Sequence, residues 1–329
     1  MCKSIHEFLS CPAALGALAL LALTVPLSAM ALEAGCGVSA TLAQLSCEYD
    51  VHDERYSHIA QCQNATTPDP ACLAAADAAA AELAEECGAV LEGRLALCAA
   101  VDDEPHDPAF GPAFAANFVD PGDIGGSVAP NPWFSLVTGN TWVYEGAGET
   151  ITVTVTDRTK LIDGITCVTV NDVAMDDGVV VEITDDWYAQ DISGNVWYCG
   201  EIAQNFESFD GDDPDDPELV DVGGSWKHGR EGAKAGILLP AVPEVGATIR
   251  QELLLGDAED VIEILSITAT ETSTGGSCTA TCLQTRDFAP LEPEANENKF
   301  YAPGLGLIVE IDTNSGDRVE LVEFTAGAG

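Results

Sequence analysis

The sequence predicts an α+β protein in which a disulfide-stapled helical hairpin precedes an all-β domain. Three observations predict this class. Six cysteines are spaced symmetrically in an alanine-rich early segment, the polar–apolar pattern changes to a period of two after residue 130, and short turn motifs separate the later apolar runs. We expect a signal peptide at 1–31, a helical hairpin at 35–103, a linker at 104–129 and the β domain at 130–325.

The first 31 residues have the features of a secretory signal peptide. An uncharged apolar run extends from Pro12 to Leu27, and Ala29-Met30-Ala31 offers small residues for cleavage. The run is too short for a comfortable membrane span, and no later segment has 18 uncharged apolar residues. We therefore expect an exported protein, periplasmic or secreted, without a membrane span.

The hairpin prediction depends on cysteine spacing. Intervals of 10, 14, 9, 14 and 10 residues separate Cys36, Cys47, Cys62, Cys72, Cys87 and Cys98. Because a helix turns once every ~3.6 residues, cysteines at these intervals fall on one stripe of each helix. Two antiparallel helices then pair them in nested order, as Cys36–Cys98, Cys47–Cys87 and Cys62–Cys72. Zinc is the alternative, but the closely spaced cysteine pairs of zinc sites do not occur among these six.

The following segment, 104–129, reads as a linker. It is rich in Pro, Gly, Asp and Ala and has no sustained period. Phe110, Phe114 and Phe118 recur every fourth residue, and we interpret them as local packing.

Strand alternation defines the β domain. Ile151, Val153 and Val155 alternate with threonines, and Asp-Gly or Gly-Asn turns join such runs. About ten strands with short connections predict an antiparallel meander. Such a sheet must hide its edges, so we expect a barrel or a curved half-barrel, with a two-sheet sandwich as the alternative.

Four cysteines lie in the β domain. We predict a Cys278–Cys282 bond, which would close a short loop. The pairing of Cys167 and Cys199 stays open. If a strand at 179–190 lies between them, their Cα atoms are about 10 Å apart, which is too far for a disulfide.

Several motifs of the β domain resemble a family of uncharacterised exported bacterial proteins. They are Asn131-Pro132-Trp133-Phe134, Gly139-x-x-Trp142-x-Tyr144-Glu145, Asp186-Trp187-Tyr188-Ala189-Gln190-Asp191, Gly194-Asn195-Val196-Trp197-Tyr198 and Tyr301-Ala302-Pro303-Gly304-x-Gly306-Leu307. The resemblance covers most of 130–325 and none of the helical segment. It implies one domain in this region and no particular chemistry.

Charge restricts the partners. The chain of 329 residues has 55 acidic and 12 basic residues, a formal net charge of −43. Such a polyanion is repelled by nucleic acid and by anionic lipid, so we exclude both. The acidic residues are scattered, which favours a solvating role.

The densest run of acidic residues is a candidate calcium loop, with an acidic solvated loop as the alternative: Asp210, Asp212, Asp213, Asp215, Asp216 and Glu218.

Basic residues gather in one short stretch. Lys227, His228, Arg230, Lys234 and Arg250 form a candidate binding site for an anionic or carboxylate ligand. The alternative is internal pairing with the abundant carboxylates.

No motif of a known catalytic class occurs: no nucleophile elbow, zinc-protease helix, P-loop or dinucleotide fingerprint. We therefore expect a non-enzymatic binding or interaction protein for an unknown small ligand or protein, with no cofactor other than calcium. The alternatives are a structural envelope component and a hydrolase that uses carboxylates, with or without calcium.

Overall fold

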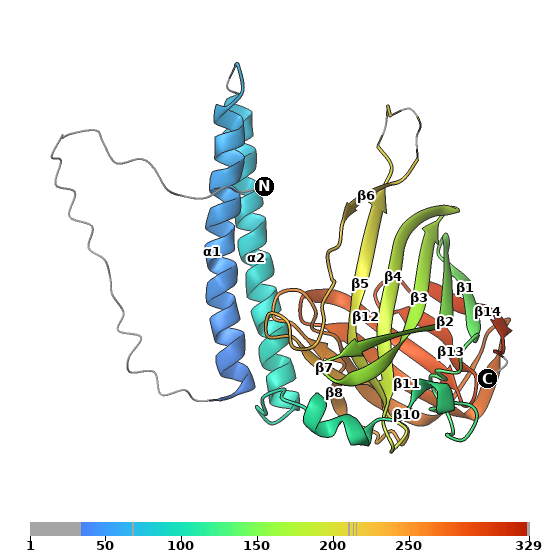
Figure 1. Cartoon of the computed structure of the whole chain (residues 1–329). Coiled ribbons are helices and arrows are strands. Elements are labelled where there is room, and N and C mark those ends of the chain that lie inside the picture. The colour runs from blue at the N-terminus through green and yellow to red at the C-terminus, as the bar shows by residue number, and fades with distance from the viewer. Residues whose placement is uncertain (1–33, 68, 210, 213, 215, 328–329) are drawn as a thin grey trace, which may run out of the picture. The chain divides into compact units, whose positions relative to one another are not determined.

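The computed structural model describes residues 34–327 except 68, 210, 213 and 215. The predicted signal peptide, 1–31, lies outside the described residues. The predicted fold class is confirmed: a disulfide-linked pair of helices is followed by a large antiparallel sheet (Figure 1). None of the helices in the described ranges has a stretch long and apolar enough to cross a membrane.

The hairpin consists of α1 (Cys36–Gln63) and α2 (Pro70–Ala100). Asp69 caps α2 by accepting a hydrogen bond from the backbone N–H of Ala71, and Pro70 takes the first helical position, where its missing N–H costs nothing. The nested pairing is confirmed, since the structure forms Cys36–Cys98, Cys47–Cys87 and Cys62–Cys72. Their Cα atoms are 5.3, 5.9 and 5.8 Å apart, which holds the helices at one separation along their length.

One buried ion pair joins the hairpin to the sheet. The Arg94 Nε of α2 donates to Glu259 Oε2 at 2.9 Å, and both side chains are almost fully buried. Glu259 Oε1 also accepts the backbone N–H of Gly256, so the same carboxylate fixes a loop of the β region. Each group compensates the charge of the other, which would be costly to bury alone.

Fourteen strands of the described chain form one sheet. The strands are β1 (Thr141–Gly146), β2 (Glu149–Ile162), β3 (Ile165–Asp176), β4 (Val179–Gln190), β5 (Val196–Glu207), β6 (Glu218–Asp221), β7 (Lys234–Leu239), β8 (Thr248–Arg250), β9 (Glu252–Leu253), β10 (Val261–Thr272), β11 (Ser277–Ala289), β12 (Glu292–Ala302), β13 (Gly306–Asp312) and β14 (Arg318–Thr325). Their order is β8-β10-β11-β12-β13-β14-β1-β2-β3-β4-β5-β7-β9, with β6 added beside β5.

The sheet is curved and open. Its end strands, β8 and β9, do not pair with each other, although only Gln251 separates them in the sequence. The chain itself therefore connects the two ends of the sheet. This arrangement is the predicted curved half-barrel rather than two stacked sheets.

Local turn chemistry sets the meander. At the β3–β4 turn, Asp177 and Gly178 have φ values of 48° and 84°, in the left-handed region. Two consecutive positive φ values are what a tight two-residue hairpin requires, and Gly or Asp accepts them at low cost.

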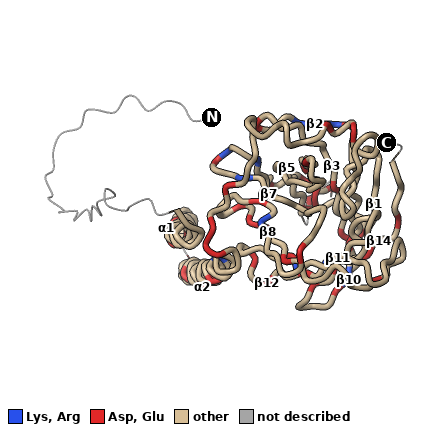
Figure 2. Tube along the Cα trace, turned by 90° about the horizontal axis from the view of Figure 1, so that it is seen from below, with Lys and Arg blue, Asp and Glu red and all other residues tan. Residues whose placement is uncertain are grey.

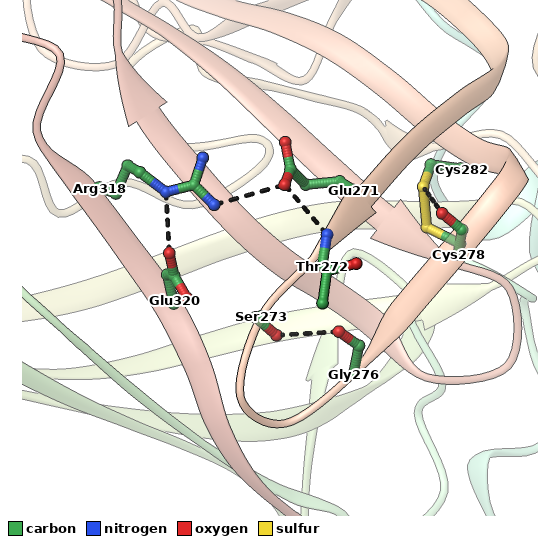
Figure 3. A network of polar contacts seen from close by, with 8 residues as sticks. All are labelled: Glu271, Thr272, Ser273, Gly276, Cys278, Cys282, Arg318 and Glu320. Carbon is green, nitrogen blue, oxygen red and sulfur yellow. Dashed lines mark hydrogen bonds and ion pairs between the residues drawn. A yellow bond between two sulfur atoms is a disulfide. The ribbon is translucent and has the colours of Figure 1, made fainter.

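A salt-bridge network holds the hairpin of β10 and β11 against β14 (Figure 3). Arg318 on β14 donates to Glu320 at 2.8 Å and to Glu271 of β10 at 3.4 Å.

The predicted Cys278–Cys282 bond is present within β11. Its Cα–Cα distance of 5.3 Å fits a disulfide, and Ala280 between the two cysteines has a φ of 54°.

The two faces of the sheet carry different cores. On the inner face Val168 and Val170 belong to the largest buried cluster, together with Trp142 and Tyr198. Their neighbours along the strand point the other way, because side chains alternate. Cys167 and Cys199 therefore lie in a second, outer cluster with Trp187, Trp197 and Phe110.

Cys167 and Cys199 are disulfide-bonded, and the expectation that an intervening strand prevents this bond is wrong. β4 does lie between β3 and β5, yet the two Cα atoms are 6.8 Å apart, within the range that a disulfide can bridge. The register jumps at Cys199, which is the extra residue of a β-bulge. A bulge increases local twist and bends the strand. Ala189 of β4, in the same cluster, is small enough for the sulfurs to pass over it.

The segment 104–129 packs on this outer cluster. Phe110 is buried and stacks against Trp197 and His228, with ring centroids 6.0 and 4.4 Å away. His106 Nε2 is 3.0 Å from the backbone carbonyl of Ala235. Phe118 also contacts Phe110, at 5.4 Å, whereas Phe114 is exposed.

All ten cysteines within the described residues are paired. Five disulfides in one chain are typical of proteins that fold in an oxidising compartment.

Candidate binding cavity

The curved sheet encloses a cavity of about 560 Å³. Side chains from strands far apart in the order line it, together with Phe134, Gln251 and Asp260 from the connections. Apolar lining residues include Val153, Val170, Leu238, Val261, Phe288 and Leu307. Nine carboxylates share the wall with them: Asp172, Glu182, Asp186, Glu201, Asp260, Asp287, Glu292, Glu297 and Glu310. Figure 2 shows acidic positions in red on many strands and few basic positions in blue.

Four of these residues, Asp172, Glu182, Asp186 and Glu201, form a group on three adjacent strands that we call the β3–β5 carboxylates. Asp186 of β4 lies directly opposite Glu201 of β5 in the antiparallel ladder. Asp172 of β3 lies opposite Thr184, which places it diagonally beside Asp186. No ion pair involves any member of this group among the described side chains. Like charges at such positions destabilise a sheet.

Burial changes the protonation of this group. Desolvation, followed by the charges of Asp186, Glu182 and Glu310, raises the pKa of Asp172 to about 8. Desolvation also raises the pKa of Asp186, although a 2.6 Å hydrogen bond donated by the Tyr198 hydroxyl opposes the shift. The pKa of Glu201 rises for the same first reason, with Asp186 adding to it. Near neutral pH a fraction of these carboxyl groups is therefore protonated, which reduces the repulsion between them.

The facing wall has a cation of its own. Lys299 of β12 lies directly opposite Glu310 of β13. Its ammonium Nζ is 3.4, 3.1 and 3.2 Å from carboxylate oxygens of Asp287, Glu297 and Glu310, and we call these four residues the Lys299 cluster. Burial opposes the charged form, but the three carboxylates outweigh it and hold the pKa of Lys299 well above its ordinary value. The cavity thus contains one example of how it can hold an ammonium group.

Tyrosine hydroxyls add unused hydrogen-bonding capacity. Tyr144 and Tyr301 line the cavity and are each 7% exposed. Neither hydroxyl has a hydrogen-bond partner among the residues that the structure describes. Buried polar groups are normally paired, so these hydroxyls are available to a ligand or to water.

The carboxylates of the cavity are not gathered into a compact metal site. In the described part of the chain, the three-residue group whose ligand atoms lie within 4.8 Å of one another is Cys36, Cys98 and Asp103. Both of those cysteines are disulfide-bonded, so they offer no thiolate. The carboxylates that surround Lys299 also exceed this spacing, although they hold an ammonium well. At Lys299, three carboxylates are spaced around an ammonium group.

Of the predicted calcium loop, the structure describes Asp212, Asp216 and Glu218, and Glu218 begins β6. Asp210, Asp213 and Asp215 are not among the described residues. Asp212, Asp216 and Glu218 are exposed. Calcium binding at this loop stays a prediction.

The predicted basic site is divided by the fold. Lys234 pairs with Asp107 at 2.7 Å, and His228 lies 3.6 Å from Asp163 while its Nδ1 accepts the N–H of Ala235. Arg250 donates to Cys36 Sγ in the hairpin.

Lys227 and Arg230 remain together. Burial and the nearby charges of Arg230 and Lys160 lower the pKa of Lys227. Lys160 in turn places its ammonium 3.8 Å from the centre of the Trp187 ring. Anion binding at Lys227 and Arg230 stays a prediction.

Sequence reasoning missed the cavity carboxylates. Asp172, Asp186 and Glu201 are isolated acids in separate strands, and 55 acidic residues gave no reason to select them. One signal was available: each occupies an inward position in the strand alternation, where an apolar residue is expected.

Comparison with protein-family models, curated proteins and solved structures finds no match to this chain. The function proposed below therefore rests on the geometry of the cavity.

Proposed function

We propose that this chain is an exported, non-enzymatic binding protein, periplasmic or secreted, whose cavity holds a small organic cation. The observation that carries the proposal is the cross-strand pair of Asp186 and Glu201, which faces the cavity without a cationic partner among the described residues. Both residues are on paired strands, β4 and β5, so their positions are fixed by backbone hydrogen bonds rather than by a loop.

An organic cation relieves the cost of this arrangement. Two adjacent carboxylates in a poorly hydrated wall repel each other and lose solvation. A ligand ammonium replaces both the lost water and the protons that burial retains. Binding should release protons, because the charged form of each carboxylate is the one that holds the ligand. Affinity should therefore increase as the pH rises through the pKa of Asp172, about 8.

The remaining wall favours an organic ligand. Val170, Leu238 and Val261 present hydrocarbon surface beside the carboxylates. Small-molecule sites are typically cavities of about 300–1,000 Å³ that combine apolar walls with placed polar groups. Here carboxylates take a large share of the wall, which suits a charged organic ligand. The Lys299 cluster supports the same choice, since three carboxylates of this cavity already surround one ammonium group.

Isothermal titration of the full mature chain tests the proposal. The panel contains alkylammonium, quaternary ammonium and guanidinium compounds, with a neutral alcohol of matched shape for each. We expect cations to bind and alcohols not to bind, and we expect Asp186→Asn to weaken binding about tenfold or more, because it removes one charge-assisted contact. The proposal is wrong if no cation binds, or if Asp186→Asn binds as the parent does.

One observation favours a second candidate, a hydrolase that uses carboxylates. The pKa of Asp186 is raised by burial within a cavity, and such a carboxyl can donate a proton near neutral pH. A panel of glycosides and esters, assayed with the parent chain and with Asp186→Asn, separates the two. Turnover that the variant loses would favour the hydrolase, and binding without turnover would favour the binding protein.

A further inference from the structure

More carboxylates of the cavity lack an ionic partner than one ammonium group can pair with. Six lining carboxylates make no ion pair with any described residue, namely Asp172, Glu182, Asp186, Glu201, Asp260 and Glu292. They come from both walls: four are on β3–β5, whereas Asp260, just before β10, and Glu292, at the start of β12, are exposed. The separate strands distribute this charge along the cavity instead of concentrating it at one point.

Electrostatic coupling links the two walls. Asp260 adds to the raised pKa of Glu201, after burial and Asp186. Glu201 and Asp260 also both act on Glu252, a neighbour whose pKa burial raises well above its ordinary value. Glu201 and Asp260 both line the cavity and influence each other's protonation.

The Lys299 cluster shows what fills such a field. One primary ammonium on a flexible methylene chain is held by three carboxylates at 3.1–3.4 Å. The unpartnered hydroxyls of Tyr144 and Tyr301 line the same space and can accept further N–H groups. Apolar side chains such as Val170 and Val261 lie between the carboxylates, where a methylene spacer would pack.

We infer that the ligand is a linear polyamine, a chain of primary or secondary ammonium groups joined by methylene spacers. This inference rests on the proposed function and adds the ligand class. One ammonium occupies the Asp186–Glu201 pair in the way that Lys299 occupies its own cluster. Further ammonium groups neutralise carboxylates toward Asp260, and the spacers contact the apolar wall.

A titration series tests the class directly. The probes are n-butylamine, putrescine, spermidine and spermine, which add ammonium groups one at a time. Titrations are run at constant ionic strength near pH 8, where the pKa of Asp172 lies. We expect affinity to increase about tenfold from n-butylamine to putrescine and again from putrescine to spermidine, because each added ammonium group gains a charge-assisted contact.

Non-specific attraction requires a matched control, because any polycation is drawn to a chain of net charge −43. The cavity variant is Asp186→Asn with Glu201→Gln. The control, Glu85→Gln with Glu86→Gln, removes the same charge from an exposed part of α2. The cavity variant should lose the preference for polyamines and the control should retain it. If the cavity variant does not fold, as judged by circular dichroism, Asp172→Asn takes its place.

The outcomes separate the two proposals. Equal affinity for n-butylamine and spermidine, lost in the cavity variant, would overturn the polyamine inference and leave cation binding intact. No binding by any amine, or equal losses in the cavity and control variants, would overturn the cavity site itself.

Discussion

Asp186 and Glu201 lie directly opposite each other on β4 and β5, whereas the equivalent opposite pair on β12 and β13 is Lys299 with Glu310. One cavity wall therefore pairs unlike charges and the other pairs like charges. The sheet tolerates the like-charge pair because burial raises the pKa values of Asp186 and Glu201, so that both need not be ionised at once. This contrast is the reason to look for a cation from outside the chain.

Replacing Asp172 by Asn should change how stability depends on pH. The folded pKa of Asp172, about 8, exceeds its ordinary value of 3.8, so the folded state binds more protons than the unfolded state between these values. Its contribution is fully present at acidic pH and is lost as the pH rises toward the folded pKa. The parent should therefore lose free energy of unfolding from about pH 5 to about pH 8, and Asp172→Asn should lose less.

Denaturant titration at constant ionic strength measures this difference. The charged and titratable groups facing Asp172 are Asp186 and Glu182 on β4, Glu310 on β13 and the Tyr144 hydroxyl on β1. They remain in the variant, so the slope should decrease rather than vanish. Asp176→Asn, at an exposed position of the same strand, is the control and should keep the parent slope. An unchanged slope in Asp172→Asn would contradict the prediction.

Truncating Lys299 to Ala should create a chemical-rescue site. The variant leaves Asp287, Glu297 and Glu310 around an empty ammonium position, and loss of one partner of a buried charge cluster costs about 3 kcal/mol or more. Added n-propylamine restores the missing group and should raise the melting temperature of the variant more than that of the parent. Propan-1-ol, which has the same shape without charge, should not. Equal effects of the amine on both proteins would refute the idea.

Glu259→Ala should destabilise the connection between the hairpin and the sheet. Arg94 would remain buried without its carboxylate, which costs about 3–5 kcal/mol, and the N–H of Gly256 would lose its acceptor. The double variant Arg94→Met with Glu259→Met should recover most of this loss, because no isolated charge remains.

An exposed pair supplies the comparison for this test. Asp77→Ala removes the partner of Arg55, whose side chain is 36% exposed, and should change the free energy of unfolding by less than about 1 kcal/mol. Urea unfolding measures all three variants. A Glu259→Ala effect as small as that of Asp77→Ala would show that the buried pair contributes little.

Peptide mapping of the non-reduced protein checks the disulfide that spacing could not assign. We expect one cross-linked peptide containing Cys167 and Cys199, in addition to the Cys278–Cys282 loop. Cys167→Ala with Cys199→Ala should lower stability by about 2–5 kcal/mol. A free thiol at either position of the parent protein would contradict the bulged geometry of β5.

The sequence alone determined the features that local physics controls. Helical periodicity placed six cysteines on facing stripes, so their spacing along the chain was enough to predict the nested pairing. Strand alternation and the Asp177-Gly178 turn likewise specified antiparallel hairpins.

Only the tertiary structure decided what meets across distance. A period of two assigns a side chain to a face but says nothing about which distant strand faces it, and register and curvature settle that. Cys199, at a bulge of β5, lies within reach of Cys167. Lys234 and Arg250, which are near each other in the sequence, contact different partners, Asp107 and Cys36. Asp186 and Glu201 became neighbours on a cavity wall in the same way, because the curved sheet brought together two acids that the sequence did not distinguish from the rest.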